Sequence, residues 1–234
     1  CQLPSAALRD IPTIGNSLLA GSGPASAPAF SYWLSHRTVK ALATLARAAK
    51  AVSGGKAFTG FYYGYVYECV GKRLTDSGHL AIAEMLREPA IDAILSPYHY
   101  GADGRNYSMP LVPHGVIDSA RLHGKLHVIE DDSRTALCTD RTCYTATGKY
   151  GDGIVASRTI SEMISKAQTN VLTAALHGLG VYFYDIPGDG WYGRPDKAAE
   201  TQQFWRAMGD LRQRLAAPVP ASTATLAPER VPAH

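Results

Sequence analysis

Residues 126 to 132 read LHVIEDD, and this stretch decides the fold. An alternating, mostly apolar run from Leu126 to Ile129 ends at three consecutive carboxylates, Glu130, Asp131 and Asp132, with Arg134 just beyond. The alternation predicts a half-buried β-strand. A turn after a strand needs a single Asp or Asn, so this much negative charge indicates either a solvated loop or the rim of a site.

The chain around this strand alternates between strand and helix patterns. Strands are predicted at 56–68, 90–100, 125–132 and 181–188, and helices at 29–52, 75–89, 116–124, 154–177 and 196–215. Such alternation predicts an α/β fold with a parallel sheet covered by helices. Residues 1–28 form an irregular N-terminal segment, 29–215 the α/β domain, and 216–234 a Pro/Ala-rich tail or linker.

Composition excludes several classes of function. The 234 residues carry a net charge of only +3, and no basic run exceeds Lys72-Arg73, so neither nucleic acid nor an anionic membrane is an expected partner. No apolar stretch is long enough to span a bilayer. Cys138 and Cys143 could close a small disulfide loop or remain two thiols, which leaves the cellular compartment open. No glycine-rich phosphate loop follows any predicted strand, so no nucleotide cofactor is expected.

The residues after each strand indicate where a ligand would bind, because parallel α/β folds bind ligands at the carboxyl ends of their strands. These ends are rich in aromatic and ionisable residues: Tyr63, Tyr65, Glu68, Tyr98, His99, Glu130, Asp131, Asp185, Asp189 and Trp191. Aromatic rings offer apolar faces to the C–H face of a sugar, and carboxylates accept hydrogen bonds from its hydroxyls. A pair of carboxyl groups can also cleave a glycosidic bond. A carbohydrate site is therefore expected.

Simpler roles compete with this interpretation. Asp131, Asp132 and Asp189 could be helix caps or solvated turn residues, and Arg134 could only balance their charge. Glu130 differs, because it is the last residue of the strand and Glu is a poor capping residue. A metal site is not expected: His123 and His127 would lie about 13 Å from each other if one strand carried both, and His123 is expected at a helix end instead.

Four stretches in order resemble the later part of the catalytic barrel in glycoside hydrolase family 42-like, β-galactosidase-like proteins: GFYYGYVYE, SGHLAIAEMLREPAIDAILSPYHY, RLHGKLHVIEDDSRT and GVYFYDIPGDGWY. The resemblance spans about Gly60 to Tyr192. It implies the last four units of a TIM-type (β/α)8 barrel and a retaining hydrolase of β-galactosides or related sugars. Glu130 would be the nucleophile, and Tyr63, Tyr65, Tyr98, His99, Asp131, Arg134, Asp185 and Trp191 would bind the sugar. A homo-oligomer is also implied.

The chain departs from the family pattern at the proton donor. The family places that Glu on the fourth strand, upstream of the matching segment, whereas the first Glu here is Glu68, which could substitute for it. We therefore expect either the C-terminal half of a catalytic domain or a non-catalytic, degenerate carbohydrate-binding barrel. An open sheet of flavodoxin-like topology is the third alternative, and it would leave the acidic triplet unexplained.

Overall fold

The computed structural model describes residues 26–64, 66, 77–100, 109–138, 157–186 and 188–217, with side chains from 30 onward. Four strands form one sheet in the order β1-β2-β3-β4, and every neighbouring pair is parallel. The strands are β1 (Gly60–Tyr62), β2 (Ala93–Pro97), β3 (Leu126–Asp131) and β4 (Gly180–Phe183). The predicted parallel α/β fold is confirmed. The described strands form an open sheet, and closure into a barrel stays a prediction.

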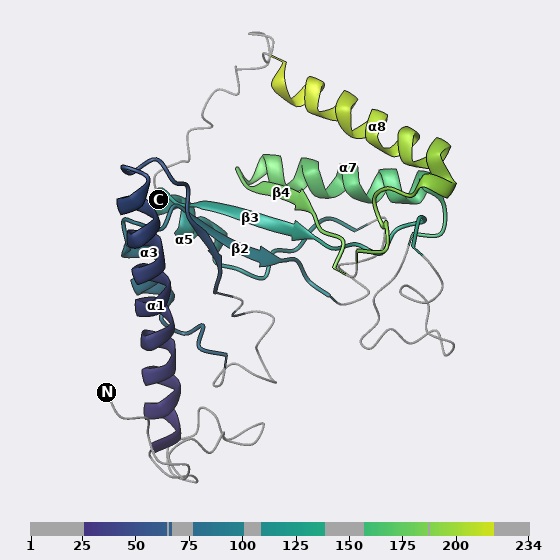
Figure 1. Ribbon diagram of the computed structural model, residues 1–234. Helices are drawn as coiled ribbons and strands as arrows, with labels where there is room; N and C mark the ends of the chain where they lie inside the picture. Colours follow the sequence, from purple (N-terminus) through teal and green to yellow (C-terminus); the bar gives the residue numbers. More distant parts are fainter. Residues whose placement is uncertain are drawn as a thin grey trace, which may run out of the picture.

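Helices connect and flank these strands. They are α1 (Ser26–Val52), α3 (Ile82–Arg87), α5 (Ile117–Leu122), α7 (Ile160–Leu176) and α8 (Ala198–Ala216), the last preceded by the short 3-10 helix η2 (Pro195–Lys197). Figure 1 shows α7 beside β4 with α8 outside it, while α1 and α3 lie together at the opposite end of the sheet. Among the described residues, no helix combines the length and the hydrophobicity that crossing a bilayer requires.

Several elements are shorter than predicted, for local reasons. Gly64 has a φ of +84°, so β1 stops well before the predicted end at residue 68. The helix predicted from 75 begins at Ile82, and the one predicted from 154 begins at Ile160, because the Thr159 side chain accepts the Glu162 N–H at 3.2 Å as an N-cap. Tyr98 leaves β2 to form an isolated antiparallel bridge with Pro113.

The described helices cover one face of the sheet. Side chains alternate along each strand, so the register places Ile94 and Ile129 on one face and Leu95, Val128 and Glu130 on the other. The first face packs against the helices: Ile94 belongs to a cluster with α1 and α3, and Phe183 packs on a second cluster built from α7 and α8. These two clusters and a small one around Tyr98 and Ile129 form the core.

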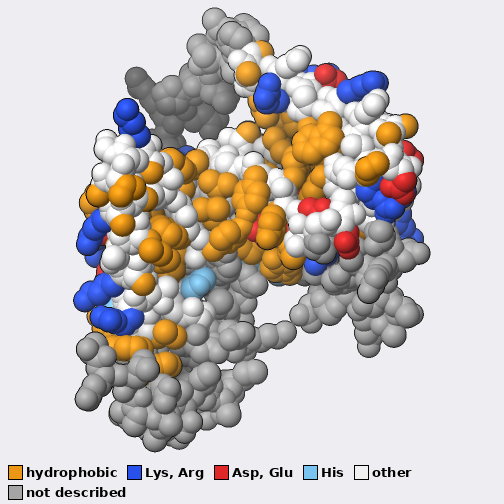
Figure 2. Space-filling model, viewed as in Figure 1, with side chains coloured by type: hydrophobic (Ala, Val, Ile, Leu, Met, Phe, Trp, Pro, Cys, Tyr) orange, Lys and Arg blue, Asp and Glu red, His pale blue; other side chains and the backbone are white. Residues whose placement is uncertain are grey.

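The opposite face of the sheet lacks helical cover among the described residues. Tyr62 is 42% exposed on this face, Leu126 is exposed, and Val128 and Tyr182 are half-buried. In Figure 2, hydrophobic side chains gather across the middle of the molecule, over the strands. We call the face that carries Tyr62, Leu95, Val128, Glu130 and Tyr182 the uncovered face. It is unusual, since parallel sheets normally bury both faces.

Candidate active site

Glu130 occupies the carboxyl end of β3 on the uncovered face. Its register partners are Pro97 of β2 and Tyr182 of β4, so it stands between two paired strands near the middle of the sheet edge. The side chain is only 6% exposed. A carboxylate held on a rigid strand at this edge is where parallel α/β proteins place ligand-binding groups.

Two phenols hold the Glu130 carboxylate. The Tyr182 hydroxyl donates to Oε2 of Glu130 at 2.8 Å, and the Tyr62 hydroxyl donates to the same oxygen. Tyr62 comes from β1, so the contact spans the sheet from its first strand to its third. Burial raises the pKa of Tyr182 to about 12, which keeps its phenol protonated as a donor near neutral pH.

Asp131 points away from Glu130, because neighbouring strand residues face opposite sides of a sheet. It is 1% exposed. Its Oδ2 accepts from the Asn170 amide at 2.8 Å, and its Oδ1 accepts from the Ser133 N–H at 3.1 Å and hydroxyl at 2.5 Å. The expected sugar contact by this carboxylate finds no support in its placement, since Asp131 lies on the helix-covered face.

Asp132 and Arg134, the next two charged residues, form a buried ion pair. Arg134 Nη1 donates to the Asp132 backbone carbonyl at 2.9 Å and to its carboxylate Oδ2 at 3.2 Å. The Arg134 guanidinium also lies 4.5 Å from the centroid of the Trp191 ring. Trp191 is 1% exposed and belongs to the core cluster under α7 and α8. The ring that the sequence suggested as a sugar platform is thus packed inside the protein against a cation.

Asp185 shapes the loop after β4. Its two carboxylate oxygens accept four backbone N–H groups, those of Gly188 at 3.1 Å, Asp189 at 3.2 Å, Gly190 at 2.7 Å and Trp191 at 3.0 Å. These contacts account for an Asp at this position without a ligand.

The other predicted site residues are dispersed. Tyr63 is fully buried and its hydroxyl accepts the Ala81 N–H at 3.1 Å; burial raises its pKa to about 12. The Tyr98 ring is buried and its hydroxyl shares a hydrogen bond with that of Ser133. His99 is half-buried beside His114, with 3.4 Å between Nδ1 and Nε2. Tyr65 and Glu68 lie outside the described residues.

Cys138 is disulfide-bonded, and its pairing with Cys143 stays a prediction. Cys143, the partner considered for it, lies outside the described residues. The Thr135 N–H contacts the Cys138 sulfur at 3.3 Å, so the bridge begins directly beyond the acidic segment.

Sequence reasoning missed three residues of this site: Tyr62, Tyr182 and Asn170. Strand alternation carries a signal for the first two, because Tyr62 and Tyr182 share a face with Glu130 once the register is known. Asn170 gives no such signal beyond being a polar residue on the buried stripe of α7.

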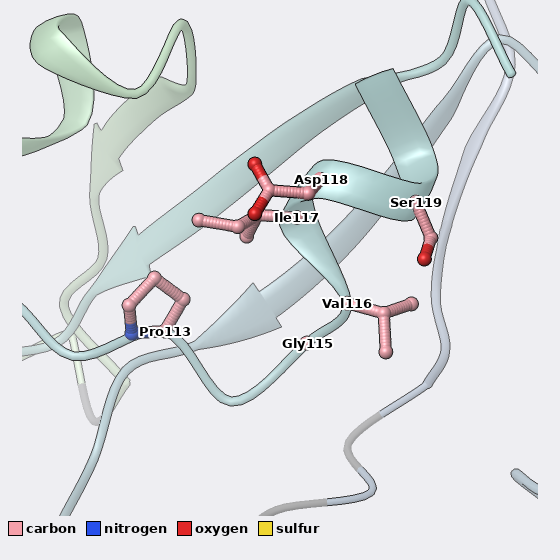
Figure 3. Close-up of a pocket in the computed structure, with 6 residues that line it drawn as sticks. All are labelled: Pro113, Gly115, Val116, Ile117, Asp118 and Ser119. Atoms are coloured by element: carbon pink, nitrogen blue, oxygen red, sulfur yellow. The ribbon is translucent and has the colours of Figure 1, made fainter. Parts of the chain in front are cut away.

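No metal site is indicated within the described part of the chain, where no cluster of three His, Cys, Asp or Glu residues could hold an ion. His127 lies on the covered face, with its Nε2 2.8 Å from the Ser96 hydroxyl. A cavity of about 370 Å³ is lined by the segment that leads into α5, shown in Figure 3: Pro113, Gly115, Val116, Ile117, Asp118 and Ser119. Among its described lining residues, Asp118 is the only charged one, and none of them is a predicted site residue.

Fold and site together define an α/β protein whose parallel sheet carries a tyrosine-bound carboxylate at its carboxyl edge. Comparison with known proteins adds no family to this class: no family model, curated protein or solved structure matches the chain.

Proposed function

We propose that this chain is part of a retaining glycoside hydrolase, with Glu130 as the nucleophile and β-galactoside-like sugars as substrates. The observation that carries the proposal is the placement of Glu130 on the uncovered face, with Tyr62 and Tyr182 both donating to its Oε2. A nucleophile needs a fixed carboxylate on a surface that a substrate can approach. In the four described strands, Glu130 is the single carboxylate on that face.

Sheet topology supports the barrel as the setting of this site. The strand order is sequential, and the described helices that pack on the sheet all lie on the same face. A doubly wound sheet of the flavodoxin type reverses its strand order and carries helices on both faces. Four sequential parallel strands with helices on one face are the arrangement expected of half a (β/α)8 barrel, and the uncovered face would then line the barrel interior.

In the proposed reaction, an oxygen of Glu130 attacks the anomeric carbon of the sugar. A C–O bond forms to Glu130, and the bond to the leaving oxygen breaks with its electron pair on that oxygen. A proton donor neutralises the leaving oxygen, and water then hydrolyses the glycosyl ester, so the configuration is retained. The proton donor would be Glu68 or a residue upstream of the family-like segment, and neither lies in the described strands.

A non-catalytic carbohydrate-binding barrel is the second candidate. It is favoured by one observation: the described strands supply one carboxylate to the uncovered face, whereas retaining hydrolysis needs two. Both candidates predict sugar binding, and they differ in whether Glu130 forms a covalent bond.

A mechanism-based label separates the two candidates. A 2,4-dinitrophenyl 2-deoxy-2-fluoro-β-galactoside needs no proton donor, because dinitrophenolate leaves unaided. We expect intact-mass spectrometry to show one sugar added to the wild-type chain, on the peptide that contains Glu130. Glu130→Gln should take no label, whereas Glu200→Gln, a matched change at an exposed position of α8, should label at the wild-type rate. Sugar binding without any labelling would refute the hydrolase and leave the binding barrel.

A further inference from the structure

A fully buried pair of polar side chains lies directly behind Glu130. Asn170 of α7 is 0% exposed and donates its amide N–H to Asp131 at 2.8 Å. Burying a carboxylate is costly unless hydrogen bonds compensate it. Asp131 receives three such bonds, one from Asn170 and two from Ser133. A buried carboxylate with three donors is a rigid feature of the structure.

Asp131 also joins the carboxyl ends of the neighbouring strands. Its backbone carbonyl accepts the Tyr192 hydroxyl at 2.7 Å and the Tyr184 N–H at 2.9 Å, which ties it to the segment after β4. Ser133, which donates to its carboxylate, shares a hydrogen bond with Tyr98 beyond the end of β2. Directly, or through Ser133, Asp131 therefore links β3 to α7 and to the segments after β2 and β4.

We infer that Asp131 and Asn170 form a positioning pair for Glu130. Asp131 and Glu130 are consecutive, so their side chains leave the strand on opposite faces. Fixing the carboxylate and the carbonyl of Asp131 leaves the backbone of Glu130 with one orientation, which aims its side chain at the uncovered face. The inference rests on the proposed function, since it concerns how the nucleophile is held.

Exchanging the side chains at 131 and 170 distinguishes the effect of their hydrogen bond from the effect of where the negative charge lies. Among the described residues, Oδ1 of Asn170 has no hydrogen-bond partner, so the bond from its amide to Asp131 is the one that an exchange has to restore. In the double variant D131N/N170D, the amide at 131 would donate to the carboxylate at 170, and its oxygen would still accept from Ser133. The hydrogen bond is restored while the negative charge moves from β3 to α7.

The test measures the rate of labelling by the dinitrophenyl fluorogalactoside together with the melting temperature. N170D sets two carboxylates against each other, and we expect labelling to slow about 10- to 100-fold, because small misplacements of a nucleophile cost up to that factor. D131N/N170D restores the hydrogen bond and should label at least about threefold faster than N170D, although the carboxylate at 170 receives one donor where Asp131 receives three. Gln168→Glu, the same change at a half-buried position of α7, is the matched control and should label normally.

A second variant keeps the test decisive if N170D fails to fold. Ser133→Ala removes one donor to Asp131 without adding charge, and it should slow labelling about threefold to tenfold. The inference is overturned if N170D or S133A lowers the melting temperature but labels at the wild-type rate, or if the exchange restores stability without restoring labelling. A wild-type chain that takes no label refutes the proposed function, and the positioning role falls with it.

Discussion

The Tyr182 hydroxyl lies 2.8 Å from Oε2 of Glu130, and the two residues are register partners on neighbouring strands. Tyr62 reaches the same oxygen from β1, on the far side of β2. The register of the parallel strands thus brings the hydroxyls of Tyr62 and Tyr182 to one oxygen of the Glu130 carboxylate. The hydrogen bonds fix the position of a side chain that would otherwise rotate about its own bonds.

Removing the Tyr182 hydroxyl should expose this role. We expect Tyr182→Phe to slow labelling of Glu130 about tenfold, equivalent to roughly 1.4 kcal/mol of barrier, and to cost about 1 kcal/mol of stability. The measurement is the labelling rate, with urea unfolding as the readout of stability. Tyr184→Phe, a matched change two residues along, should alter neither quantity. Equal rates for the two variants would show that the Tyr182 phenol does not position Glu130.

Burial of the His127 side chain should make the stability of the fold depend on pH. It is 2% exposed in the core, and burial lowers its pKa to about 4. The unfolded chain, with an ordinary histidine pKa of 6.5, binds this proton more readily than the folded chain does between pH 4 and 6.5. Stability should therefore fall on acidification through this window, by up to about 1.4 kcal/mol per pH unit and about 3 kcal/mol in total.

Urea unfolding at pH 7 and pH 5 measures this effect. His127→Gln keeps a group able to reach Ser96 and removes the titration, so its stability should change less between the two pH values than that of the wild type. His177→Gln, at an exposed position after α7, should retain the wild-type dependence. The burial argument fails if the wild type and H127Q lose the same stability on acidification.

The order and type of elements were predictable because they depend on local pattern. Alternation and helical periodicity located all four strands and the helices between them, and a series of strand–helix units gave the parallel sheet. Element ends were less predictable. Gly64 and Thr159 set two of them through a positive φ and a side-chain cap, which a periodic pattern does not encode.

The candidate site was predictable only in part, because it depends on which residues meet across strands. Glu130 was identified from its place at a strand end. Asp131 was grouped with it, although alternation alone sends consecutive residues to opposite faces. The Tyr62 contact depends on register between strands far apart in the sequence, and the burial of Trp191 depends on a loop fold that Asp185 organises. Neither has a local signature.

The first strand is anchored to the long helix through Asp92. Its Oδ2 accepts from Lys50 Nζ of α1 at 2.6 Å and from the Thr59 N–H at 2.7 Å. The hydrogen bond from Lys50 holds the pKa of Asp92 below its usual value. A lowered carboxyl pKa contributes stability above the unfolded pKa near 4, and this contribution is lost as the pH falls through the folded value.

We therefore expect Asp92→Asn to cost about 1 kcal/mol at pH 7, a modest value because the ion pair is partly solvated. The difference from the wild type should shrink toward pH 3, because below its pKa near 4 the unfolded chain binds this proton more readily than the folded chain does. Urea unfolding at both pH values measures it, with exposed Asp118→Asn as the control. A cost that stays constant from pH 7 to pH 3 would assign the effect to packing instead of charge.

A substitution at Asp185 distinguishes a role in shaping the loop after β4 from a role in binding sugar. Because its carboxylate accepts the backbone N–H groups of residues 188, 189, 190 and 191, Asp185→Ala leaves four donors without their acceptor. We expect hydrogen exchange in the peptide covering 188–192 to accelerate at least tenfold, with a loss of about 1–3 kcal/mol in stability. Exposed Asp189→Ala is the neighbouring control and should leave exchange unchanged. If hydrogen exchange in D185A proceeds at the wild-type rate but the variant binds galactosides more weakly, the carboxylate binds sugar, and its four hydrogen bonds to the loop are secondary.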